Sequence, residues 1–149
     1  MARILVIDDD KTVAKAIRIV LELEGFEVSV VHDGRSGIER VTSEPFDLLM
    51  VDVFMPGMDG LETIRLVRER RPQLPILVMS GLSFRSGPAA APDFLAMATK
   101  LGAIRSLKKP FRPRELLAAI AESLEASTRE APQATPPGTL TSRTQGSGP

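Results

Sequence analysis

Short apolar segments alternate with amphipathic segments along residues 1–125. The apolar segments are rich in Val, Ile and Leu and cover residues 3–7, 27–31, 47–51, 76–79 and 104–107. Their length and composition predict five β-strands. Apolar residues at three- and four-residue spacing predict five helices, over residues 11–24, 36–42, 61–71, 93–101 and 113–124.

The alternating order of these elements predicts an α/β fold with a parallel sheet. The first, third and fourth strands are apolar on both faces, as expected when helices cover a sheet from each side. Parallel strands need crossover connections, which the intervening helices supply. Ligands of open sheets of this kind bind outside the carboxyl ends of the strands.

The composition changes sharply at Ala126. Thr, Ser, Pro and Gly make up 15 of the last 24 residues, and Leu140 is the only large apolar residue there. Such a segment buries too little apolar surface to offset the entropy cost of ordering it. We therefore expect one domain over residues 1–125 and a disordered tail over residues 126–149.

Overall composition excludes several classes of function. The 149 residues carry a net charge of zero and contain no Cys, Trp or Tyr. These features argue against electrostatic nucleic-acid binding, thiolate metal sites, cysteine nucleophiles and aromatic stacking platforms. No apolar segment approaches the ~20 residues of a membrane span, and the N-terminus does not resemble a signal peptide. The predicted location is the cytoplasm.

Polar residues stand at four of the five predicted strand ends. The first strand is followed by Asp8, Asp9 and Asp10, whereas Asp52, Ser80 and Lys109 follow the third, fourth and fifth strands. Carboxylates that converge at one edge repel each other unless a cation is present, and oxygen ligands favour Mg²⁺. Together with an ammonium and a hydroxyl, they suit the binding of a phosphoryl group.

Each of these residues also has a simpler interpretation. Asp10 could only cap the following helix, Ser80 could be a turn residue, and Lys109 could be solvated. Four of the five strand ends carry residues that suit the same phosphoryl-binding chemistry, and this favours the functional interpretation.

The sequence resembles the receiver domain of bacterial two-component response regulators over residues 3–125. The resemblance is carried by four segments in the family's order: ILVIDDD at 4–10, LLMVDVFMPGMDG at 48–60, ILVMSG at 76–81 and LGAIRSLKKPF at 101–111. It implies a flavodoxin-like three-layer αβα sandwich whose doubly wound five-stranded parallel sheet has the order 2-1-3-4-5. It also implies phosphorelay signal transduction.

The resemblance implies a role for each strand-end residue. Asp52 would be the phosphoacceptor, Ser80 would bond a phosphoryl oxygen, and Lys109 would form an ion pair with it. The bond between Lys109 and Pro110 is expected to be cis. The magnesium ligands would be Asp8, Asp9, Asp52 and the backbone carbonyl of Phe54.

The implied partners are proteins. A sensor histidine kinase or a histidine phosphotransfer protein would donate the phosphoryl group, and a downstream protein target would read the phosphorylated state. We expect no direct nucleic-acid contact, no membrane insertion, a monomer or weak homodimer, and no enzymatic activity beyond self-phosphorylation and self-dephosphorylation. The polar tail is too short to fold as an output domain, which favours a stand-alone receiver.

Three single positions and one segment bear on how this chain would signal compared with the family. Ser106 stands where the family usually has Tyr or Phe, so the common aromatic switch is absent. The segment after Ser80 is several residues longer than expected, with the excess in residues 83–93. Phe54 and Leu82 are apolar where a polar side chain could orient an attacking water, which predicts slow self-dephosphorylation.

Two alternatives remain at this point. The segment ILVIDDDKT also fits haloacid-dehalogenase-like phosphatases, in which Asp8 would be the nucleophile and Asp10 the acid/base. That interpretation leaves Asp52 unexplained. The sequence also has no acidic pair after Lys109 that could supply the metal ligands of such a phosphatase. The second alternative is a receiver-like binding module that is not phosphorylated.

Overall fold

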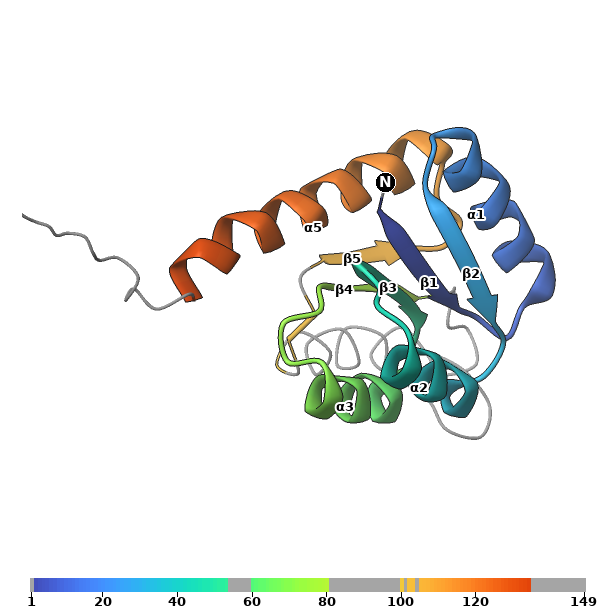
Figure 1. Ribbon diagram of the computed structural model, residues 1–149. Helices are drawn as coiled ribbons and strands as arrows, with labels where there is room; N and C mark the ends of the chain where they lie inside the picture. The colour runs from blue at the N-terminus through green and yellow to red at the C-terminus, as the bar shows by residue number, and fades with distance from the viewer. Residues whose placement is uncertain (1, 54–59, 81–99, 101, 104, 135–149) are drawn as a thin grey trace, which may run out of the picture.

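The computed structural model describes residues 2–53, 60–80, 100, 102, 103 and 105–134. Strands and helices alternate through most of this part of the chain (Figure 1). Their bounds are β1 Arg3–Ile7, α1 Lys11–Leu23, β2 Glu27–Val31, α2 Gly34–Ser43, β3 Leu48–Asp52, α3 Gly60–Arg70, β4 Ile76–Ser80, β5 Arg105–Lys108 and α5 Pro113–Ala134. The predicted helix over residues 93–101 lies outside the described residues, apart from Lys100.

The five strands form one parallel sheet in the order β2-β1-β3-β4-β5. The sheet order and the parallel pairing confirm the predicted fold class. Strands β1, β3 and β4 occupy the middle of the sheet and are almost wholly buried, as their two apolar faces predicted. Because all strands run the same way, their carboxyl ends lie along one edge.

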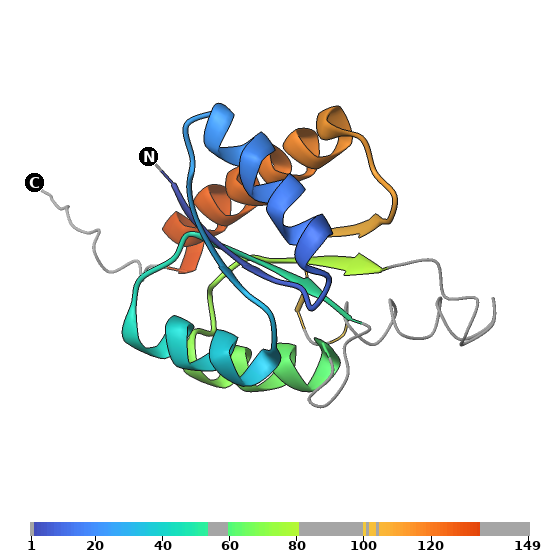
Figure 2. The same cartoon turned by 90° about the vertical axis from the view of Figure 1, so that its right-hand side faces the viewer.

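Helices cover both faces of the sheet and create two hydrophobic cores. Figure 2 shows α1 and α5 on one face and α2 and α3 on the other. Alternate residues of each central strand therefore join different cores: Leu5 packs on the side of α2 and α3, whereas Val6 packs on the side of α1 and α5. Burial of apolar side chains from both faces supplies the main driving force for this three-layer arrangement.

Helix α5 ends later than the sequence analysis predicted. The disordered tail was expected to begin at Ala126, but α5 continues to Ala134, and its end projects past the sheet in Figure 1. The prediction relied on the composition of the whole segment. Its first six residues, ASTREA, contain two Ala together with Arg and Glu, all of which favour helix, whereas Pro132 opposes it. Residues 135–149 lie outside the described part. Within that part, no helix is long and apolar enough to cross a membrane.

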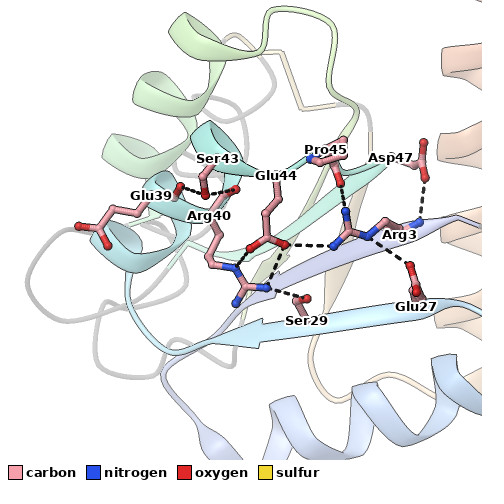
Figure 3. A network of polar contacts seen from close by, with 9 residues as sticks. All are labelled: Arg3, Glu27, Ser29, Glu39, Arg40, Ser43, Glu44, Pro45 and Asp47. Atoms are coloured by element: carbon pink, nitrogen blue, oxygen red, sulfur yellow. Dashed lines mark hydrogen bonds and ion pairs between the residues drawn. The ribbon is translucent and has the colours of Figure 1, made fainter.

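A network of charged side chains ties the amino-terminal edge of the sheet together, opposite the predicted site (Figure 3). Arg3 of β1 forms ion pairs with Glu27 of β2 at 3.2 Å and with Glu44, which follows α2, at 3.0 Å. Glu44 also accepts a 2.7 Å bond from Arg40. The hydrogen bond from Arg40 is the main reason that the pKa of Glu44 is lowered, with a smaller contribution from Arg3.

This lowered pKa predicts how the stability depends on pH. A carboxyl whose folded pKa is depressed stabilises the fold above its unfolded pKa, and the contribution is lost as the pH falls through the folded pKa. Wild type should therefore resist urea better than Glu44→Gln at neutral pH. The gap between their urea midpoints should narrow steadily as the pH falls below the ordinary pKa of a glutamate. A gap that stays constant over this range would contradict a charged contribution from Glu44.

Candidate functional site

The carboxyl edge of the sheet holds buried polar side chains at the predicted positions. Asp8 follows β1 and is fully buried, while Asp52 at the end of β3 and Ser80 at the end of β4 are 4% and 2% exposed. Asp52 lies opposite Met79 in the pairing of β3 with β4. Buried polar groups need partners, because an isolated charge in a low-dielectric interior is costly.

Lys109 supplies the positive charge at this edge. Its Nζ lies 2.6 Å from Asp8 Oδ2 and 3.0 Å from Asp52 Oδ2, and its side chain is 15% exposed. The main chain fixes the base of this side chain, because the Lys109 N–H donates to the Ser80 carbonyl at 2.7 Å. The peptide bond between Lys109 and Pro110 is cis, as predicted.

Opposing effects act on the charge of Lys109. Burial lowers the pKa of the ammonium group and is the largest single effect. The hydrogen bond to Asp8 and the charges of Asp52 and Asp8 together outweigh it, so the pKa of Lys109 is raised above its ordinary value. Lys109 therefore remains a cation at neutral pH and lies between the two buried carboxylates.

Every polar atom of Asp8, on the main chain and on the side chain, has a hydrogen-bond partner. Its Oδ2 accepts from Lys109, and its Oδ1 accepts from the Asp10 N–H at 2.9 Å. The Asp8 N–H donates to the Val31 carbonyl at 3.1 Å, and the Asp8 carbonyl lies 3.0 Å from Nδ1 of His32. These contacts together fix the orientation of the carboxylate.

Three carboxylates form a group that fits a divalent cation. One oxygen from each of Asp8, Asp9 and Asp52 lies within 4.8 Å of the others. Three carboxylates against the single ammonium of Lys109 leave two formal negative charges, which Mg²⁺ would balance. Asp9 is exposed and leaves room for the waters that Mg²⁺ retains. Phe54, whose carbonyl was predicted to be a ligand, lies outside the described residues, as does Leu82.

Asp10 does not belong to this group. Its side chain caps α1 by accepting from the N–H groups of Thr12 and Val13 at 3.0 and 3.2 Å. The simpler interpretation of this residue is therefore confirmed. The cap also counts against the phosphatase alternative, because there Asp10 would need a carboxyl that is free to exchange protons with substrate.

Two features of the site were missed by the sequence analysis. One is the contact of His32 with Asp8, since the end of β2 was thought to add nothing. The other is Gly60, whose N–H donates to the Val53 carbonyl and at which a Cβ would overlap the main chain of Asp52 and Val53. A side chain at Gly60 would therefore displace the end of β3. The segment MDG offered a signal for this close approach, because glycine allows the backbone to come near.

Ser106, which stands at the usual position of an aromatic residue, is exposed on β5. Its neighbour Leu107 is the buried residue of this short edge strand. The extended segment over residues 83–93 lies outside the described part of the chain.

Comparisons with known proteins agree with this geometry. The model of the response regulator receiver domain family matches residues 4–121. The response regulator MprA of Mycobacterium ulcerans is 40% identical over 116 residues, which cover 78% of this chain and 47% of MprA. The chain thus spans about half the length of the curated relatives it matches.

Solved structures show the same similarity. A CheY-like receiver domain protein from Methanospirillum hungatei has a TM-score of 0.79 and 28% identity, covering 87% of this chain and 98% of that protein. CheY4 of Vibrio cholerae has a TM-score of 0.72 and 29% identity, with coverages of 83% and 98%. The chain belongs to the response regulator receiver domain family. These findings favour neither the phosphatase nor the non-phosphorylated alternative.

Proposed function

We propose that this receiver domain works in a phosphorelay and accepts a phosphoryl group on Asp52. The observation that carries the proposal is the position of Asp52, which is buried at the carboxyl end of β3. It lies 3.0 Å from a lysine ammonium and beside two further carboxylates. A buried carboxylate next to a cation and a prospective metal site can act as a nucleophile toward phosphorus.

In the transfer, an Asp52 oxygen forms a bond to the phosphorus of a phosphohistidine on a partner protein. The bond between phosphorus and the imidazole nitrogen breaks, and the imidazole takes up a proton. Lys109 then forms an ion pair with the phosphoryl group, and the Ser80 hydroxyl donates a hydrogen bond to one of its oxygens. Mg²⁺, held by Asp8, Asp9, Asp52 and the Phe54 carbonyl, would neutralise negative charge on the phosphoryl oxygens.

The phosphoryl donor would be a sensor histidine kinase or a histidine phosphotransfer protein of the cytoplasm. His32, the only histidine of this chain, is engaged with Asp8. Phosphorylation would alter the contacts of Lys109 with Asp8 and Asp52 and so shift the population between two conformations, one of which binds a downstream protein. The domain over residues 1–125 would perform this role as a monomer or weak homodimer. Its only chemistry would be self-phosphorylation and self-dephosphorylation.

The proposal is tested by the intact mass of the protein after incubation with a small acyl phosphate. Wild type should gain one phosphoryl group in Mg²⁺ and little or none in EDTA. Asp9→Asn should gain it much more slowly at the same Mg²⁺ concentration, because one cation ligand is weakened. Equal labelling with and without Mg²⁺ would contradict the assigned metal site.

A further inference from the structure

His32, which follows β2, contacts the main chain of Asp8, which follows the neighbouring strand β1. Its Nδ1 lies 3.0 Å from the Asp8 carbonyl oxygen, and the ring is partly buried after β2. A carbonyl oxygen only accepts hydrogen bonds, so Nδ1 must carry the hydrogen and donate. The sequence separation of 24 residues makes this a tertiary contact between two strand ends.

The contact continues the pairing of β1 with β2 beyond the last paired residues. The register ends with Ile7 opposite Val31, and the Asp8 N–H still donates to the Val31 carbonyl. In a parallel ladder the next bond would run from the Asp33 N–H to the Asp8 carbonyl. The chain has already turned there, because Asp33 caps α2. The His32 ring supplies the donor in place of that main-chain group.

This bond fixes the peptide group that joins Asp8 to Asp9. Asp8 is also held through its carboxylate, whereas no described residue forms a hydrogen bond or ion pair with the Asp9 carboxylate. The direction of the Asp9 side chain therefore depends on the orientation of the preceding peptide. A cation ligand that is oriented by its main chain loses affinity when that main chain becomes free to rotate.

We propose that His32 is a positioning residue for Mg²⁺. It acts through the Asp8–Asp9 peptide by holding the Asp9 carboxylate in the direction that the cation requires. This inference rests on the metal site proposed above and adds a supporting residue that directly follows β2. The property that matters is a donor on the γ-carbon of residue 32, rather than an aromatic ring.

Two substitutions separate the donor from the bulk of the side chain. His32→Asn keeps a nitrogen donor attached to the γ-carbon, in the place of Nδ1, but removes most of the ring. His32→Leu removes the donor and places there an apolar side chain that is larger than Asn and closer to His in size. If positioning is the role, His32→Leu should weaken Mg²⁺ binding on the order of tenfold, and His32→Asn should restore it to within about threefold of wild type.

The experiment is calorimetric titration of the full chain with Mg²⁺, alongside thermal unfolding in EDTA to choose a temperature at which every variant is folded. Asp9→Asn identifies the site, since it should bind Mg²⁺ far more weakly than wild type. Wild-type affinity in His32→Leu would overturn the positioning role and leave the metal site standing. Equal losses in His32→Leu and His32→Asn would overturn it as well, because the donor would then be irrelevant. No binding by wild type would overturn both the site and the inference.

Discussion

Asp52→Asn should abolish the gain of one phosphoryl group that wild type shows with an acyl phosphate and Mg²⁺. The neutral amide offers no anionic oxygen to attack phosphorus, and it also weakens the cation site. Asn has nearly the same size as Asp and can still accept a hydrogen bond from Lys109, so the buried pocket should remain filled. Intact-protein mass at several times after mixing measures the effect directly.

Asp47→Asn is the matched control for this substitution. Asp47 is exposed at the opposite edge of the sheet, where it accepts a hydrogen bond from the Arg3 N–H at 2.8 Å. The same chemical change at that edge should leave phosphoryl incorporation unchanged. If Asp52→Asn still gained a phosphoryl group, another residue would be the acceptor. The assignment of Asp52 in the proposed function would then be wrong.

The sequence could predict that the site residues lie together, because their proximity follows from the topology of the sheet. Once the strands are read as parallel, residues that follow different strands must meet at one edge, however far apart they are in sequence. Asp8 and Lys109 are separated by 101 residues, yet their side-chain atoms lie 2.6 Å apart. No knowledge of side-chain conformations is needed for that prediction, only the period and order of the apolar segments.

The contact of His32 could not be predicted in the same way. It depends on where β2 ends relative to β1, and therefore on the register that places Ile7 opposite Val31. A shift of one residue would place a different side chain beside the Asp8 carbonyl. The sequence pattern indicates which segments are strands, but their ends are uncertain by a residue or more. A single His after a strand then resembles an ordinary turn residue.

The end of α5 was mispredicted for a related reason. Composition averaged over residues 126–149 is dominated by the Pro, Gly and Thr residues at positions 135–149. Residues 126–131 include Ala126, Arg129, Glu130 and Ala131, which favour helix, and they follow a helix that is already nucleated and packed on the sheet. Extending an existing helix costs much less than starting one, so modest propensity suffices. Local propensity does not explain the continuation through Pro132.

Lys109→Met should lower the free energy of unfolding by about 3 kcal/mol in EDTA at neutral pH, because two buried carboxylates lose their cation. Asp8 is fully buried and Asp52 nearly so, and both accept from the Lys109 ammonium. Met retains the apolar stem, so the loss reports the charge more than the packing. Urea unfolding followed by circular dichroism gives the difference.

The pH dependence of this difference follows from the raised pKa of Lys109. A cation whose folded pKa is raised contributes fully below its unfolded pKa, and the contribution is lost only as the pH rises through the folded value. The gap between wild type and Lys109→Met should therefore stay constant between about pH 7 and pH 9. A gap that shrinks in this range would show that Lys109 is not the stabilising cation.

Mg²⁺ should reduce the gap, because it supplies positive charge to the same carboxylates. At a given Mg²⁺ concentration, binding stabilises the folded state more when the affinity is higher, and the carboxylates of Lys109→Met attract the cation more strongly. Lys108→Met is the matched control, since Lys108 is exposed on β5. That variant should unfold like wild type with or without Mg²⁺. If Lys108→Met and Lys109→Met were equally stable in EDTA, the charge balance inferred for Asp8, Asp52 and Lys109 would be wrong.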